Sequence, residues 1–165
     1  MPVYSSVPAG IARNYSSDAP LTASTTIGSA NDCRYHRSLE AQVISKIAIH
    51  VVVQSGNLSV AVFAADATGI PSTRTATSGA VAVPAPGYAE LSLGASVSVR
   101  AGDFLAISCD NNTATFIGLG LNGLTSDLFQ EVLYVQATAH PAPASTSIGS
   151  LLAQSNRSLA IRGVT

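Results

Sequence analysis

Few side chains in this sequence have the types and spacing of a catalytic or metal-binding group. The three histidines are His36, His50 and His140, and no two of them have a spacing typical of metal ligands, such as HxH or HExxH. Cys33 lies close enough to His36 in the sequence to suggest a thiol–imidazole pair. Because both residues fall in a stretch that we predict to be a loop, we interpret Cys33 as a packing residue.

The carboxylates are mostly turn residues. Asp66, Asp103 and Asp110 each precede or follow a predicted strand. The oxygens of Asp110-Asn111-Asn112 could bind calcium, but such a run is more typical of a simple turn. Two carboxylates from distant strands could hydrolyse a glycosidic bond. The absence of tryptophan and the 5% aromatic content disfavour a sugar site.

Serines are numerous, but no GxSxG motif is present and no histidine is placed beside a serine nucleophile. The sequence therefore predicts no catalytic residue, no metal ion and no cofactor. We expect a protein that is not an enzyme.

The elements that carry these residues are predicted to be β-strands. Ile47, Ile49, Val51 and Val53 alternate with more polar positions, which is the period of a half-buried strand. A turn at 55–57 follows, and the alternation resumes over 58–63. The simplest interpretation of this unit is a β-hairpin.

Further strands are predicted along the rest of the chain. Residues 104–109 are apolar on both faces, which predicts a central strand, whereas 73–77 is predicted to be an edge strand. A total of eight to ten strands without a helical period favours a sandwich or barrel. The remaining predicted strands are 21–27, 80–83, 88–93, 96–100, 113–119, 128–136 and 158–162, and 139–145 is predicted to be a loop.

The first 40 residues differ from the rest, so we divide the chain into an N-terminal arm with a first strand (1–40) and a sandwich domain (41–165). Tyr4, Tyr15 and Tyr35 are three of the five tyrosines and are spread along this arm. An extended arm with spaced tyrosines could lie along a neighbouring subunit. A first strand preceded by a loose end is the alternative, and the sequence leaves both open.

Composition indicates association with another protein. Hydrophobic residues make up 47% of the chain and charged residues only 10%, against about 25% in ordinary domains. We therefore expect a homo-oligomer, a dimer or trimer, or a protein lattice. Lys46 is the only lysine, and Arg34 and Arg37 are the only close basic pair, so no nucleic-acid partner is predicted.

Targeting and redox signals indicate an intracellular product. The start of the chain lacks the basic and apolar regions of a signal peptide, and no apolar run is long enough to cross a bilayer, so no membrane partner is predicted. Cys33 and Cys109 could form one disulfide. Because a reducing cytosol usually prevents this, we predict two buried free thiols.

Several short motifs resemble jelly-roll modules in structural proteins of tailed-bacteriophage virions, among them tail proteins and capsid cement or decoration proteins. In that pattern a strand ends in a Gly-x-Pro turn, an apolar hairpin follows, and an "aGdy-x-la" strand comes later. The resemblance implies a jelly-roll-like antiparallel β-sandwich and carries no catalytic residues. The matching segments are 58–63, 69–73, 78–84, 87–91, 100–106 and 159–164.

This resemblance implies a virion protein that assembles in the host cytoplasm. A capsid decoration protein, which stabilises the head by binding the major capsid protein, is the favoured role because the chain is one domain without a fibre-like repeat. A tail or baseplate component that binds a receptor is the alternative, and a carbohydrate-binding module is a third. The residues that we expect at the partner interface are Tyr4, Arg13, Tyr15, Arg34, Tyr35 and Arg74.

Overall fold

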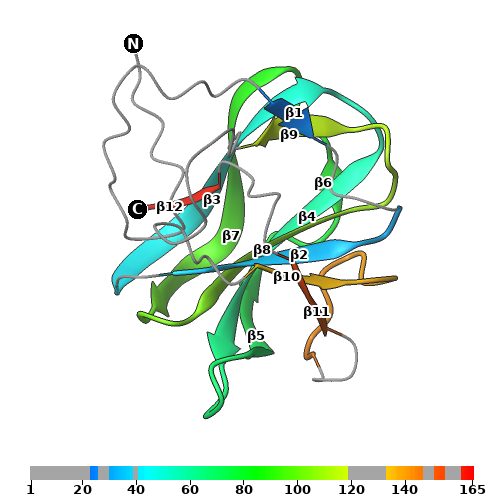
Figure 1. Cartoon of the computed structure of the whole chain (residues 1–165). Helices are drawn as coiled ribbons and strands as arrows, with labels where there is room; N and C mark the ends of the chain where they lie inside the picture. The colour runs from blue at the N-terminus through cyan, green and yellow to red at the C-terminus, as the bar shows by residue number, and fades with distance from the viewer. Residues whose placement is uncertain (1–22, 26–29, 39–40, 119–132, 147–150, 155–160) are drawn as a thin grey trace.

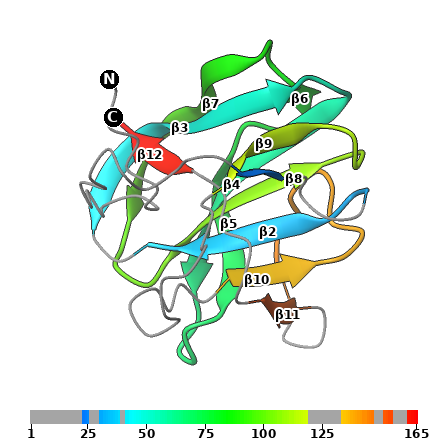
Figure 2. The ribbon, with the colours of Figure 1, turned by 45° about the horizontal axis from the view of Figure 1, so that its top comes forward.

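The chain forms a β-sandwich, seen in a computed structural model that describes residues 23–25, 30–38, 41–118, 133–146, 151–154 and 161–165. All regular elements in these ranges are strands, and they form two antiparallel sheets packed against each other (Figures 1 and 2). The strands are β1 (Ala23–Thr25), β2 (Cys33–Arg37), β3 (Gln42–Val53), β4 (Asn57–Ala65), β5 (Pro71–Thr77), β6 (Val81–Ala82), β7 (Gly87–Val99), β8 (Phe104–Cys109), β9 (Thr115–Gly118), β10 (Leu133–Gln136), β11 (Leu151–Gln154) and β12 (Arg162–Val164).

The first sheet, sheet A, is built around β3. One edge of β3 pairs with β7, and its other edge is shared by β12 near Lys46–Ala48 and by β9 near Val51 and Val53. The short strand β1 pairs with the far side of β9. The spatial order is therefore β1-β9-β3-β7, with β12 beside the first half of β3.

The second sheet, sheet B, has the order β11-β10-β2-β8-β4-β5, and β6 pairs with the start of β4. Strand β8 lies between β2 and β4 and all six of its residues are buried, which confirms the central strand predicted from its apolar pattern. The prediction of a loop around Cys33 and His36 is wrong. These residues belong to β2, whose alternation is hidden because both of its faces are buried, so polar and apolar side chains are covered alike.

The predicted hairpin of 47–63 is also wrong, because β3 and β4 lie in different sheets and have different partners. Gly56 turns the chain between the sheets with a φ of 61°, a conformation in the left-handed region that glycine adopts without steric cost. Alternating strands joined by a short turn give the same sequence pattern whether they pair or pack face to face. The partners that decide the outcome are distant in sequence.

The segment predicted as two strands, 88–93 and 96–100, is the single strand β7. Its pairing with β3 shifts between Ile44↔Val97 and Lys46↔Ser92, so one residue of β3 faces the four residues 93–96 of β7. Gly94 in this bulge has a φ of 79°. Of the predicted 128–136 strand, the part from Leu133 to Gln136 is β10 and 128–132 lie outside the described residues, while of the predicted 158–162 strand 158–160 lie outside them and the described strand there is Arg162–Val164.

The core between the sheets comes from one face of each main strand. Burying an aliphatic side chain of this size contributes about 1.5–3 kcal/mol to folding. The predicted alternation of β3 is confirmed for Ile47, Ile49 and Val51, which are buried, whereas Val53, predicted to continue the series, is 42% exposed. The buried members include Ile44, Ile47, Ile49, Val51, Leu58, Val60, Val62, Leu91, Leu93, Leu105, Ile107 and Phe116.

Candidate functional site

The outer face of sheet B is closed by residues 137–146, which we call the cover loop. Ala139 and Ala142 pack on the second hydrophobic cluster, which lies on this face. The backbone N–H of Ala139 donates to Asn31 O at 2.6 Å, and at the other end Thr146 N donates to Ser72 O at 2.8 Å. The cover loop therefore extends from a residue preceding β2 to β5, and covers sheet B between them.

The cover loop also pairs with part of the predicted edge strand. Strand β5 is the last strand of sheet B, as predicted, but Arg74 N donates to Ala144 O at 2.9 Å and Thr73 forms an isolated bridge with Ser145. The Arg74 guanidinium also donates to Ala142 O through Nη1. The first half of this edge is therefore occupied by the chain itself.

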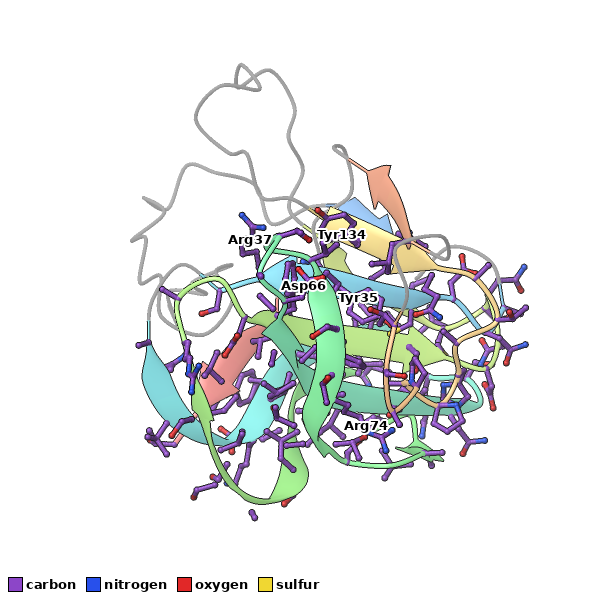
Figure 3. The ribbon with its side chains drawn as sticks, turned by 90° about the horizontal axis from the view of Figure 1, so that it is seen from below. Tyr35, Arg37, Asp66, Arg74 and Tyr134 are labelled. Carbon is purple, nitrogen blue, oxygen red and sulfur yellow. The ribbon has the colours of Figure 1, made fainter. Side chains whose placement is uncertain are left out.

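An aromatic cluster fills the space on this face of sheet B (Figure 3). The rings of Tyr35 and Phe63 meet edge to face with centroids 5.0 Å apart, and Phe104 meets Tyr134 in the same way at 5.8 Å. The Arg37 guanidinium lies 5.5 Å from the centre of the Phe104 ring. Since Tyr35, Phe63 and Phe104 are fully buried, they provide packing and no flat surface on which a sugar could stack.

A serine–histidine pair, which the sequence analysis missed, forms beneath the cover loop. Ser108 Oγ lies 3.0 Å from His140 Nδ1, although the two residues are 32 positions apart. Ser108 has no exposed surface, so its hydroxyl cannot reach a substrate in this conformation. The pair instead ties the cover loop to β8. The sequence carried no signal for it, because nothing indicated that the loop folds back over this strand.

The thiol–imidazole pair suggested by Cys33 and His36 does not form, because an odd separation along a strand places the two side chains on opposite faces. Burial is the main cause that raises the pKa of the Cys33 thiol to about 12. The thiol is therefore protonated and unreactive at neutral pH. This agrees with the interpretation of Cys33 as a packing residue.

The two cysteines are free and buried. Cys33 pairs in register with Ser108, the residue before Cys109, so the two sulfur atoms point to opposite faces of sheet B. Cys33 belongs to the cluster under the cover loop and Cys109 to the core between the sheets. A disulfide between them would require a one-residue shift of register.

We expect thiol labelling to reflect this arrangement. The native protein should react slowly with a thiol reagent, because both sulfur atoms are buried, whereas the protein unfolded without reductant should take up two labels per chain. Mass spectrometry of the labelled protein would count them. Fewer than two labels after unfolding would show that one or both thiols are oxidised, which would contradict the geometry.

The Asp110-Asn111 pair forms turn structure, as the sequence suggested. Asp110 accepts hydrogen bonds from the backbone N–H and the side-chain amide of Asn57 at 2.9 and 2.8 Å, and the Asn57 backbone bond is the main cause that lowers the pKa of Asp110. Asn111 Oδ1 accepts from the backbone N–H groups of Thr113 and Ala114. The oxygens that calcium would need already hold the corner between β3 and β4 and the turn after β8.

The residues predicted at a partner interface lie in different places. Tyr4, Arg13 and Tyr15 fall outside the described residues. Arg34 is 2% exposed and Tyr35 is fully buried, with its hydroxyl donating to Gln136 Oε1 at 2.7 Å. Arg74 is half-buried and is bound to the cover loop. The structure thus leaves little side-chain surface on Arg34 and Tyr35 for another molecule.

Among the described residues, the exposed large apolar side chains belong to sheet A. In the part of the chain that the structure describes, the exposed large hydrophobic side chains are Val43, Val52, Val53 and Tyr88, and all four come from β3 or β7. The outer face of sheet A, together with these residues, is the candidate functional surface. The sequence placed Tyr88 on a strand but could not show that this strand lies beside β3.

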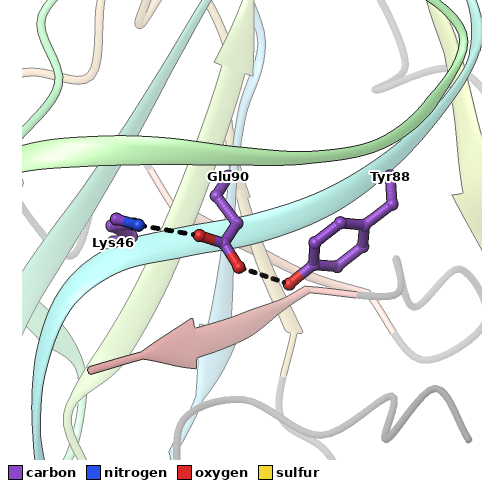
Figure 4. A network of polar contacts seen from close by, with 3 residues as sticks. All are labelled: Lys46, Tyr88 and Glu90. Carbon is purple, nitrogen blue, oxygen red and sulfur yellow. Dashed lines mark hydrogen bonds and ion pairs between the residues drawn. The ribbon is translucent and has the colours of Figure 1, made fainter. Parts of the chain in front are cut away.

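A neutral polar network lies on this surface (Figure 4). Lys46 Nζ is 2.9 Å from Glu90 Oε2, and Tyr88 donates its hydroxyl to Glu90 Oε1 at 2.9 Å. The hydrogen bond to Glu90 is the main cause that raises the pKa of Lys46. Because the single lysine is neutralised by Glu90, the network adds no net charge to this part of the surface.

Comparison with known proteins gave no match to any family model, curated protein or solved structure. The described elements include no helix of the length and apolarity needed to cross a membrane. Among the described residues there is also no cluster of three or more metal-ligating side chains. The function must therefore be inferred from the surface and the fold.

Proposed function

We propose that this chain is a non-enzymatic structural protein of a tailed-bacteriophage particle, and specifically a decoration protein that binds the major capsid protein and stabilises the head. The observation that carries the proposal is that the two outer faces of the sandwich differ in how far they are covered. The outer face of sheet B is closed by the cover loop. The exposed large apolar side chains of the described residues all come from two strands of sheet A, β3 and β7, which fits attachment to another protein through that side.

The fold supports the resemblance to virion jelly rolls. Eight strands divide into the orders β1-β9-β3-β7 and β2-β8-β4-β5, and most consecutive strands change sheet. A double-sheet arrangement of eight strands in two Greek keys is the jelly roll. We assign this topology to the sandwich, with β10, β11 and the cover loop as additions to the edge and outer face of sheet B.

The chemistry of the described residues also suits a passive binding role. The serine–histidine pair is buried, the Cys33 thiol is protonated, and the turn carboxylates are engaged by backbone N–H groups. Low charge matches a protein that hides part of its surface in an assembly. Assembly in the host cytoplasm agrees with two free thiols.

The test is to add the purified protein to phage heads that lack it. We expect the temperature at which the heads rupture to rise, because a protein that binds only the assembled state stabilises that state. Val52→Asp and Val53→Asp, on the open side, should each reduce the gain. Ala144→Asp is the matched control, since Ala144 is exposed but lies in the cover loop.

Two outcomes would change the assignment. Heads that rupture at the same temperature with and without the protein would contradict the decoration role. Binding that saturates at a few copies per particle, in place of hundreds, would favour a tail or baseplate component. Loss of the gain with Ala144→Asp but not with Val52→Asp would show that the protein attaches through sheet B.

A further inference from the structure

Among the described residues, no strand is hydrogen-bonded to the outer edge of β7. Strand β7 pairs with β3 along one side and stands last in the order β1-β9-β3-β7. An edge of this kind presents backbone N–H and C=O groups that another strand can pair with. Folded proteins usually protect such edges with charged residues, proline, bulges or a covering segment.

Within the described part of the chain, protecting features occur at both ends of this edge, and one short segment between them has no paired strand. Pro84 and Pro86, which lack an N–H, precede the strand, and the bulge at 93–96 follows it. Between them, 87–92 pairs regularly with Lys46–Val51 of β3 and contains Glu90 as its single charged residue. Glu90 is neutralised by Lys46. The pairing-competent part of the edge is therefore about as long as an ordinary strand.

We propose that two copies of this chain associate through this segment, with β7 of each copy pairing antiparallel to β7 of the other over Gly87–Leu91 and with Ala89 on the two-fold axis. Such a pairing joins the two A sheets into one continuous sheet. It uses the same residues on both copies, as a two-fold dimer requires. This dimer proposal does not depend on whether the protein binds a phage head.

The register follows from the faces of the strand on which Tyr88, Ala89 and Glu90 lie and from the charge of Glu90. Opposite residues of an antiparallel pair share a face, so the axis must pass through a residue and not between two. An axis at Ala89 places Tyr88 of each copy opposite Glu90 of the other, both on the outer face. These two groups already form a hydrogen bond within one chain, so their contact across the axis is complementary.

The neighbouring registers are less favourable. An axis at Glu90 would place two carboxylates directly opposite each other, and like charges in that position destabilise a sheet. An axis at Tyr88 would place Glu90 opposite Pro86, which has no N–H to donate. An axis at Leu91 would extend the pairing to Gly94, inside the bulge. Ala89 is therefore the centre that satisfies both backbone pairing and charge.

A second copy is also a better occupant than a foreign strand, because its edge supplies the complementary groups. The Tyr88–Glu90 contact is provided twice by symmetry, and the small side chain at Ala89 lets the two strands approach. The segment carries no net charge once Lys46 is counted, so bringing two copies together opposes no excess charge.

Sedimentation velocity and native mass spectrometry at high micromolar concentration would test the pairing. We expect the wild-type protein to reach twice the 16.7 kDa mass of the chain. Tyr88→Glu should weaken the dimer at least tenfold, because it places carboxylates opposite Glu90 on both sides of the axis. The double variant Tyr88→Glu with Glu90→Tyr exchanges the two groups and should restore most of the affinity.

Ser98→Glu is the matched control, since Ser98 is exposed on the same strand but lies beyond the bulge, and it should leave the dimer unchanged. Circular dichroism would establish that every variant is folded. A wild-type monomer at all concentrations would overturn the proposal. So would a dimer that is equally stable in the Tyr88→Glu variant, or one that the exchanged double variant fails to restore.

Discussion

Replacing His36 with leucine is expected to stabilise the sandwich at neutral pH and to remove much of its sensitivity to mild acid. His36 is 1% exposed, and neither of its ring nitrogens has a hydrogen-bond partner. A buried polar group without a partner costs about 1–3 kcal/mol, and an apolar group of similar size avoids that cost. The side chain lies on the face of β2 that also carries Arg34, opposite Leu105 of β8.

The acid sensitivity follows from the pKa of His36. Burial, and secondarily the nearby Arg34 charge, lower this pKa from 6.5 to about 3. Between these values the unfolded chain binds a proton at His36 and the folded chain does not, so the free energy of unfolding falls as the pH falls. The slope is about 1.4 kcal/mol for each pH unit once the unfolded histidine is fully protonated.

Urea unfolding at intervals from pH 7.5 to pH 5 would measure this slope. The range stops at pH 5 because Asp66 and Asp110, whose pKa values are also lowered, contribute their own loss at lower pH. His36→Gln is the matched control: it removes the titration but keeps a buried polar group, so it should flatten the slope without the gain at neutral pH. A slope that neither variant changes would show that another group titrates.

The positions of several strands could be predicted from the sequence because their alternation is local. β8 and the inward face of β3 followed directly from apolar spacing. The location of β2 could not be predicted, because a strand buried on both faces but carrying Arg34 and His36 has the composition of an exposed loop. Burial of these side chains depends on segments that pack against β2, and no local pattern encodes those.

The pairing partners of the strands could not be predicted from the sequence either. The β3–β4 unit was predicted to be a hairpin, and the bonds that hold it as a corner between sheets come from Asp110, 53 residues beyond Asn57. The contacts on the candidate surface could not be predicted for the same reason. Tyr88, Glu90 and Lys46 each stood on a predicted strand, but their contact depends on the β3–β7 pairing, which joins residues 44 positions apart.

Asp66, Asp103 and Asp110 all lie in turns that the sequence predicted, but the partners of their hydrogen bonds could not be predicted. Asp103 is expected to matter most among them for stability. Its side chain is 8% exposed and accepts hydrogen bonds from Arg100 N at 2.8 Å and Ala65 N at 3.0 Å. Its backbone carbonyl accepts from Ser38 N. One residue therefore connects the β7–β8 turn with the end of β4 and the end of β2, across both sheets.

Asp103→Ala should lower the free energy of unfolding by about 2–6 kcal/mol, because it leaves the part-buried N–H groups of Arg100 and Ala65 without this acceptor, each costing about 1–3 kcal/mol. Asp66→Ala is the matched control. The Asp66 carboxylate also accepts several hydrogen bonds, from Thr68 and Ile70, but all of them lie within its own exposed turn. Water can replace that carboxylate, so the loss should stay near 1 kcal/mol or below.

Chemical denaturation of the two variants under identical conditions would compare them, and equal slopes in denaturant would show that the unfolded states are alike. Asp103→Asn should fall between wild type and alanine, since one amide oxygen can still accept a bond while the amide nitrogen faces an N–H donor. Equal losses in Asp103→Ala and Asp66→Ala would mean that the bond to Ala65 adds nothing beyond a local turn. A loss confined to Asp103 would instead show that the sandwich depends on this long-range bond, which local turn chemistry does not reveal.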